Sequence, residues 1–207
     1  MKNIITIQHT QSVHHTNGMH GGQGDWNLSE LGVEQAKRIG EKLSKELKDK
    51  KCIMYSSDLL RAKQTAENVG KYLGIEPMLR NELREISLGD ANGISKEEAK
   101  KIFLSSAGTI DDISYPNAES MRDVYNRLSV FLNEVLASKE ENIIVVAHGI
   151  SLGVFNILWL GLEAEVLNKC GMWGVSGSLS FMREVLSEFG VKQRLISRFN
   201  DRSYIQL

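Results

Sequence analysis

The sequence predicts an α/β fold with a mainly parallel central sheet and an antiparallel edge strand. Short β-branched runs alternate with amphipathic stretches of about 12 to 20 residues as far as Gly161, which is the pattern of βαβ units. The last quarter differs, because residues 178–185 and 192–198 alternate apolar and polar side chains around a turn at 187–190. The 207 residues contain no internal repeat and only two prolines, so we expect a single domain over residues 1–207.

Individual strands follow from short apolar runs, and helices from apolar residues at helical spacing behind a capping residue. The expected strands are residues 3–8, 52–55, a segment within 79–86, 142–147 and the two arms of the hairpin. The expected helices are residues 29–48, residues 59–73, one opened by the capping box of Ser95 and Glu98, one opened by Ser120 and one after Gly149. The run 142–147 is apolar on both faces and therefore predicts a fully buried strand.

Composition argues against several classes of partner. Lys and Arg number 25 against 26 Asp and Glu, so the basic surplus that drives nucleic-acid binding is missing. No stretch approaches the roughly 18 to 20 apolar residues of a membrane span, and the N-terminus runs directly into a strand. We therefore expect a cytoplasmic protein without a nucleic-acid or membrane partner. Cys52 and Cys170 lack any pairing pattern and are interpreted as inert thiols.

Two histidines stand directly after expected strands. His9 closes the strand 3–8, and His148 closes the strand 142–147 and is followed by Gly149 and a helix. A single histidine in such a place is more often structural than catalytic. Two at equivalent strand ends favour a shared site, because the carboxyl ends of parallel strands meet at one edge of the sheet, where α/β proteins build their sites.

Arg61 lies at the start of the helix that follows the second expected strand. A cation at a helix N-terminus opposes the helix dipole, whereas an anion there is stabilised. The position of Arg61 therefore indicates an anionic ligand rather than helix stability.

Six segments, taken in their order along the chain, resemble the motifs of one family. They are residues 8–12 (QHTQS), 28–32 (LSELG), 56–66 (SSDLLRAKQTA), 83–89 (LREISLG), 118–120 (AES) and 146–149 (VAHG). This order is similar to that of the histidine phosphatase superfamily, also called phosphoglycerate mutase-like. The nearest likeness is to broad-specificity and α-ribazole-type phosphatases.

The resemblance implies a three-layer α/β/α sandwich and a phosphomonoesterase that needs neither metal nor cofactor and acts on a small phosphorylated metabolite through a phosphohistidine. It implies that His9 is the nucleophile, Arg61 a phosphate clamp, His148 a second phosphate contact and Glu85 the general acid. These roles agree with the chemistry, since neutral imidazole is nucleophilic near neutral pH and phosphoryl transfer depends on positioning and donors.

The chain departs from the family in its first motif. Gln8 stands where the family has arginine, and a glutamine cannot form a guanidinium fork on a phosphate. The motifs also assign substrate binding to Gln8, Ser12, His15 and Gly149, with His15 in the place of a family asparagine. Because one positive charge is missing, we expect one of the loop histidines to supply it, and the candidates are His14, His15 and His20.

Three loop histidines also raise the question of a metal. Adjacent His14 and His15 make poor ligand geometry, and no carboxylate or cysteine joins them at ligand spacing, so no metal is expected. The alternatives that stay open are a catalytically weakened phospho-ligand-binding or regulatory protein, and a phosphoglycerate-type mutase. The loops 18–25 and 91–116 carry no readable substrate code, and a homodimer is one of the oligomeric states that the sequence leaves open.

Overall fold

The computed structural model describes residues 1–105 and 107–206. Its sheet has six strands in the order β3-β2-β4-β1-β5-β6, of which β3, β2, β4 and β1 run parallel. Strand β5 runs antiparallel to β1 and to the edge strand β6. The strands are β1 (Asn3–Gln8), β2 (Cys52–Ser57), β3 (Met78–Arg80), β4 (Asn142–Ala147), β5 (Leu179–Leu186) and β6 (Lys192–Asp201).

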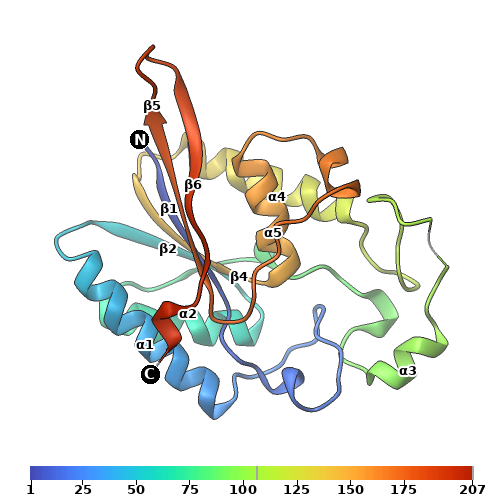
Figure 1. Ribbon diagram of the computed structural model, residues 1–207. Helices are drawn as coiled ribbons and strands as arrows, with labels where there is room; N and C mark the ends of the chain where they lie inside the picture. Colours follow the sequence, from blue (N-terminus) through green and yellow to red (C-terminus); the bar gives the residue numbers. More distant parts are fainter. Residues whose placement is uncertain (106, 207) are drawn as a thin grey trace.

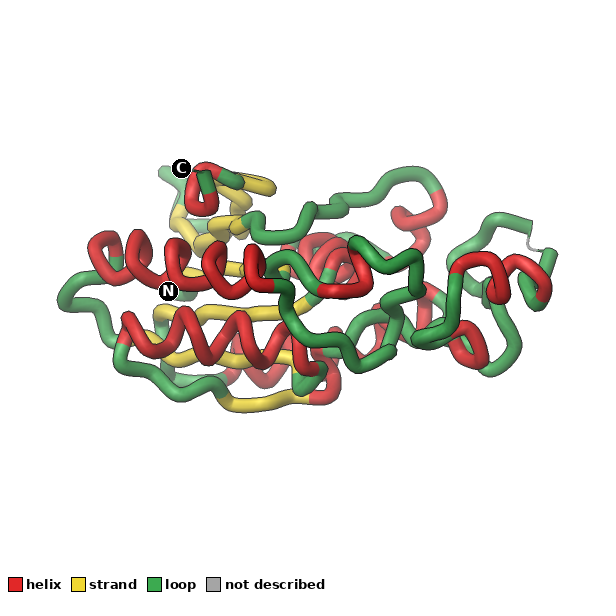
Figure 2. The backbone as a smooth tube through the Cα atoms, turned by 90° about the horizontal axis from the view of Figure 1, so that it is seen from below, coloured by secondary structure: helices red, strands yellow, loops and turns green. Residues whose placement is uncertain are grey.

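Helices cover both faces of this sheet (Figure 1). They are α1 (Glu30–Glu46), α2 (Leu60–Leu73), α3 (Lys96–Lys101), α4 (Met121–Ala137) and α5 (Gly149–Trp159). Helices α1 and α2 lie side by side on one face, as Figure 2 also shows, and α4 and α5 lie on the other face. Among the described residues, no helix is long and apolar enough to cross a membrane. The predicted three-layer α/β/α sandwich is confirmed.

Strand β4 forms the centre of the core, because its side chains pack in both directions. Ile143 and Val145 join the cluster that contains α4 and α5, whereas Ile144 and Val146 join the cluster that contains α1 and α2. All four side chains are at most 1% exposed. Burial on both faces explains why this run is continuously apolar in the sequence.

The predicted elements are present with small differences in their ends. The third strand is only three residues long, from Met78 to Arg80, and a 3-10 turn at Asn81–Leu83 replaces the rest of the expected segment 79–86. The hairpin extends further than expected, since β6 ends at Asp201. Ser95 makes the capping box with Glu98 that the sequence predicted, and Ser120 opens α4 as predicted, where the structure adds a capping box with Asp123.

Gly32, in the first turn of α1, allows that helix to touch the loop that follows β1. A Cβ at this position would lie 1.9 Å from the carbonyl oxygen of Gln11. We therefore expect Gly32→Ala to lower the free energy of unfolding by about 1–3 kcal/mol, as in other overpacked sites, measured by urea denaturation. Lys37→Ala, on an exposed position of the same helix, is the matched control, with a change of less than about 0.5 kcal/mol. An unchanged urea midpoint for Gly32→Ala would contradict the close packing.

Candidate active site

The strand order brings the two strand-end histidines together. Strands β2, β4 and β1 are parallel neighbours, and Gln8 pairs with Ala147, so His9 and His148 leave the sheet at the same edge. Their ring centroids are 5.1 Å apart. Arg61, in the first turn of α2 behind β2, places its Nε 3.2 Å from His9 Nε2. Three side chains from distant parts of the sequence thus form one cluster.

The hydrogen bonds of His9 determine where its proton sits. His9 Nδ1 lies 2.9 Å from the carbonyl oxygen of Thr10, which can only accept, so Nδ1 carries the hydrogen. His9 Nε2 therefore has a lone pair, and this lone pair accepts from Arg61 Nε. Burial, and then the charge of Arg61, hold the pKa of His9 well below its ordinary value of 6.5. The ring is neutral at physiological pH, with a nucleophilic nitrogen facing the cluster.

Arg61 is a buried cation that also ties down the glycine-dense loop. Its Nη1 donates to the carbonyl oxygen of Gly24 at 2.7 Å, and its Nη2 donates to that of Gly22 at 2.6 Å. Burial lowers the pKa of Arg61 to about 10, so it remains charged near neutral pH. The first turn of α2 is further held by Asp25, whose carboxylate accepts from the backbone N–H of Leu60. These carbonyl contacts could not be predicted from the sequence, because a backbone carbonyl of any residue could supply them.

His148 is fully buried, and only one of its two ring nitrogens has a hydrogen-bond partner among the described residues. Its Nε2 lies 2.8 Å from Ser57 Oγ at the end of β2, whereas its Nδ1 has no hydrogen-bond partner within residues 1–105 and 107–206. Burial first, and then the charge of Arg61, keep the pKa of His148 well below 6.5. Ser57 was not among the predicted site residues, although it lies within a matched motif. An unsatisfied buried nitrogen beside His9 is suited to contact a ligand oxygen.

The carboxylate of Glu85 lies at the N-terminus of α5. It accepts backbone hydrogen bonds from Ile150 at 3.2 Å and Ser151 at 3.1 Å, and Ile86 N adds a third at 3.0 Å. Gly149 begins this helix, so its N–H is one of the first-turn donors that lack an acceptor within the helix. Glu85 thus stands near the same helix start that follows His148, and its charge also acts on Arg61.

Glu119 holds this arrangement in place. Its carboxylate pairs with Arg127 at 2.9 Å and accepts from the backbone N–H of Ser87 at 2.8 Å. Arg127 in turn donates to the backbone carbonyl of Glu85 at 3.2 Å. These contacts make Glu119 a structural anchor near the site, since they hold the segment that carries Glu85.

Two of the three loop histidines join the cluster. The His15 ring stacks on His9 with centroids 5.4 Å apart, and the His14 ring lies 6.0 Å from His9 and 4.1 Å from His15. His20 instead packs edge-on against Tyr115. In the part of the chain that the structure describes, no three His, Cys, Asp or Glu residues are grouped so as to hold a metal ion.

Gln8 sits between two glycines that the sequence did not connect. A Cβ on Gly149 would lie 3.3 Å from Gln8 Nε2, and one on Gly174 would lie 2.8 Å from Gln8 Oε1. The Gln8 side chain is 9% exposed, and its Oε1 has no partner among the described residues. The segment that contains Gly174 also reaches His9, since Ser176 Oγ donates to the His9 carbonyl oxygen.

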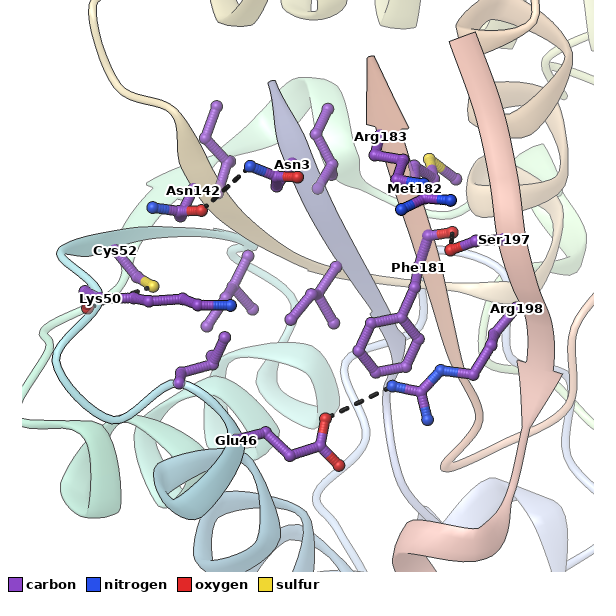
Figure 3. A pocket seen from close by; sticks show the side chains of 15 residues that line it. Asn3, Glu46, Lys50, Cys52, Asn142, Phe181, Met182, Arg183, Ser197 and Arg198 are labelled. Carbon is purple, nitrogen blue, oxygen red and sulfur yellow. Dashed lines mark hydrogen bonds and ion pairs between the residues drawn. The ribbon is translucent and has the colours of Figure 1, made fainter. Parts of the chain in front are cut away.

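A separate cavity of about 400 Å³ lies at the other edge of the sheet (Figure 3). Asn3 and Asn142, at the starts of β1 and β4, line it and are hydrogen-bonded to each other at 3.2 Å. The ion pair of Glu46 and Arg198 closes one side of it. None of the clustered histidines lines this cavity, so its volume says nothing about their chemistry.

An α/β/α sandwich that gathers histidines and a buried arginine at the carboxyl edge of its sheet defines a class of phosphate-handling proteins. The profile of the histidine phosphatase superfamily (branch 1) matches residues 4–190. The chain belongs to this superfamily, which confirms the prediction made from the order of the motifs.

Individual relatives extend over most of the chain. Phosphoserine phosphatase 1 of Hydrogenobacter thermophilus is 28% identical over 89% of this chain and 88% of its own. The 2,3-bisphosphoglycerate-dependent phosphoglycerate mutase of Azorhizobium caulinodans is 32% identical over 80% of this chain and 85% of its own. The structure of a mycobacterial glucosyl-3-phosphoglycerate phosphatase superposes with a TM-score of 0.79 at 25% identity, over 96% of this chain and 98% of that one.

Proposed function

We propose that this protein is a phosphomonoesterase that hydrolyses a small phosphorylated metabolite through a phosphohistidine on His9. The observation that carries the proposal is the unprotonated Nε2 of His9, buried beside the guanidinium of Arg61 and the unsatisfied Nδ1 of His148. A nucleophile next to two oxygen-binding groups is what transfer of a phosphoryl group requires.

The reaction has two displacements. In the first, His9 Nε2 attacks phosphorus, the bond to the leaving oxygen breaks, and protonated Glu85 gives its proton to that oxygen. In the second, water attacks the phosphorus of the phosphohistidine, Glu85 takes a proton from the water, the P–N bond breaks with its electron pair returning to His9 Nε2, and orthophosphate leaves. Arg61 and His148 contact the equatorial oxygens during both steps.

The proposed substrate-binding residues act in different ways. Gly149 offers a backbone N–H at the start of α5, and Gln8 offers its side-chain amide. His15 offers a ring N–H from its position over His9. Ser12 contributes through the histidines that it holds, since its hydroxyl donates to the carbonyl oxygen of Asn27 at 2.7 Å and is not free for a ligand.

The names of the relatives support hydrolysis over mutase activity, since the phosphatase relative is matched over more of this chain than the mutase relative, 89% against 80%. Two of these relatives are named for phosphoserine and glucosyl-3-phosphoglycerate, which are phosphate esters of small metabolites. We propose a cytoplasmic enzyme of one domain, residues 1–207, that uses no metal or cofactor and has neither a nucleic-acid nor a membrane partner. A homodimer is compatible with this proposal.

A screen of small phosphate esters for released orthophosphate, run from pH 5 to 8 with and without a chelator, tests the function. The panel includes phosphoserine, phosphoglycerates, sugar phosphates and p-nitrophenyl phosphate. Hydrolysis of at least one natural ester, unaffected by the chelator, is expected. Transfer of the phosphoryl group to a second metabolite in preference to water would support the mutase instead.

Gln8 favours a second candidate, a phospho-ligand-binding protein that has lost most of its catalysis. Losing one charged donor to the transition state costs about 3–4 kcal/mol where nothing replaces it. If the protein is a working phosphatase, we expect Gln8→Arg to change kcat/KM for its best ester by less than about tenfold in either direction. Steady-state kinetics measures this on the ester identified in the screen, or on every ester of the panel where the parent protein hydrolyses none, with His20→Gln as the control outside the cluster. A rise from undetectable to ordinary activity would identify the parent protein as a binder.

A further inference from the structure

Three loop histidines are candidates for the positive charge that Gln8 cannot supply, and their surroundings differ. His20 lies against Tyr115, outside the cluster of rings around His9. His14 and His15 both belong to the cluster, at ring distances of 6.0 Å and 5.4 Å from His9. Position therefore leaves His14 and His15 as candidates, and the hydrogen bonds of the two rings distinguish between them.

The backbone fixes His15 as a neutral donor. The N–H of Ser12 donates to His15 Nδ1 at 3.2 Å, so this nitrogen must carry a lone pair and the ring hydrogen sits on Nε2. A proton on Nδ1 would face the N–H of Ser12 and break this bond. His15 thus offers an N–H to a ligand without becoming charged.

His14 has the opposite arrangement. The hydroxyl of Ser12 uses its hydrogen on the carbonyl oxygen of Asn27, so its oxygen can only accept from His14 Nδ1, which lies 3.1 Å away. His14 Nδ1 therefore carries the hydrogen, and His14 Nε2 has a lone pair with no hydrogen-bond partner in residues 1–105 and 107–206. A second proton on Nε2 would break no bond.

We propose that His14 takes up a proton when a tetrahedral oxyanion enters beside His9, and so becomes the second cation of the site. The inference rests on the proposed function, because the oxyanion in question is the phosphoryl group of the substrate. Protonation of His14 thus adds a second positive charge, beside that of Arg61, only while the ligand is bound.

The charges around His14 explain why it is neutral before the ligand binds. Burial first, and then His15, Arg61 of α2 and Lys96 of α3, lower the pKa of His14 to about 3. The rings of His9 and His148 also belong to this group of interacting sites. All of these neighbours are neutral or positive, so none of them supplies a negative charge that would stabilise an imidazolium.

A doubly charged oxyanion reverses the sign of this field. At an effective dielectric constant of about 20, each negative charge about 6 Å away favours the imidazolium by on the order of 10²-fold. Two charges are therefore enough to bring the pKa of His14 from about 3 into the neutral range. Anion binding and protonation of His14 then support each other.

Inorganic sulfate tests the inference without turnover, because it is a tetrahedral dianion that does not itself titrate between pH 5 and 8. Calorimetry in two buffers of different ionisation enthalpy, at constant ionic strength, measures the protons taken up on binding. We expect an uptake that approaches one proton near pH 5. As pH rises, the sulfate affinity should fall about tenfold per pH unit, until the pH passes the pKa of His14 in the sulfate-bound protein. Nitrogen-15 chemical shifts of the histidine rings in the unaltered protein report the same proton on His14 directly.

Variants assign the proton to one ring. His14→Gln should abolish the uptake and leave a weak affinity that no longer depends on pH, whereas His14→Arg should give a strong affinity that is also independent of pH. His15→Gln and His20→Gln should keep the uptake. Uptake that persists in His14→Gln, no uptake in the parent protein, or no sulfate binding at all would each overturn the inference.

The test separates this inference from the proposed function. A protein that binds sulfate with proton uptake and hydrolyses no ester would contradict the proposed phosphatase activity and support the inference about His14. A protein that hydrolyses esters and binds sulfate without proton uptake would support the phosphatase activity and contradict the inference about His14.

Discussion

His9→Ala should abolish the phosphoenzyme and lower kcat by on the order of 10⁴-fold or more, because no other group in the cluster can replace an uncharged nucleophilic Nε2 held beside Arg61. Brief incubation with a ³²P-labelled ester, followed by quenching without acid, should leave label on the parent protein. That label should be acid-labile and stable to alkali, as a phosphoramidate is.

His20→Ala is the control, since His20 packs against Tyr115 outside the cluster and should label normally. The low pKa of His9 adds a second expectation: its ring stays unprotonated well below pH 6.5, so labelling should persist into mildly acidic solution. A label that survives in His9→Ala would assign the nucleophile to another residue, with His148 the nearest ring at 5.1 Å.

Glu85→Gln should lower kcat for alkyl phosphates by about 10²–10⁴-fold and leave hydrolysis of p-nitrophenyl phosphate nearly unchanged. The reason is the leaving group, because an alkoxide needs a proton to depart and a nitrophenolate does not. The measurement is the ratio of the two kcat values on one preparation, which does not depend on how much of the variant is folded.

Stability needs its own check here, since the Glu85 carboxylate accepts three backbone hydrogen bonds and an amide would satisfy fewer of them. Glu97→Gln, on the exposed side of α3, is the matched charge-removing control and should leave the ratio unchanged. Equal losses on both substrates in Glu85→Gln would mean that Glu85 positions the site and does not donate the proton.

The sequence was sufficient to predict the features that depend on local pattern. Alternating strand and helix periodicities gave the α/β class, and the two-sided apolar run 142–147 gave the central strand. The capping box of Ser95 and Glu98 marked the start of α3, and Ser120 marked the start of α4. The short third strand was less predictable, because only three of its residues pair with β2 and the chain then turns.

Within the candidate site, the sequence predicted which side chains would be present, because His9, Arg61 and His148 each follow the end of a strand. It left open which loop histidine could carry a charge. That choice depends on Ser12, whose backbone N–H donates to one ring and whose hydroxyl accepts from the other.

The sequence by itself thus determined the fold class, the family and the edge of the sheet at which the chemistry-bearing residues collect. Only the tertiary structure decided the partners: Ser57 for His148, the carbonyls of Gly22 and Gly24 for Arg61, and Gly174 beside Gln8. The physical reason is that a strand or helix is specified by neighbours a few residues apart, whereas these contacts join segments up to 166 positions apart. Strand order brings them together, and the directions of their hydrogen bonds then fix the protonation of each ring.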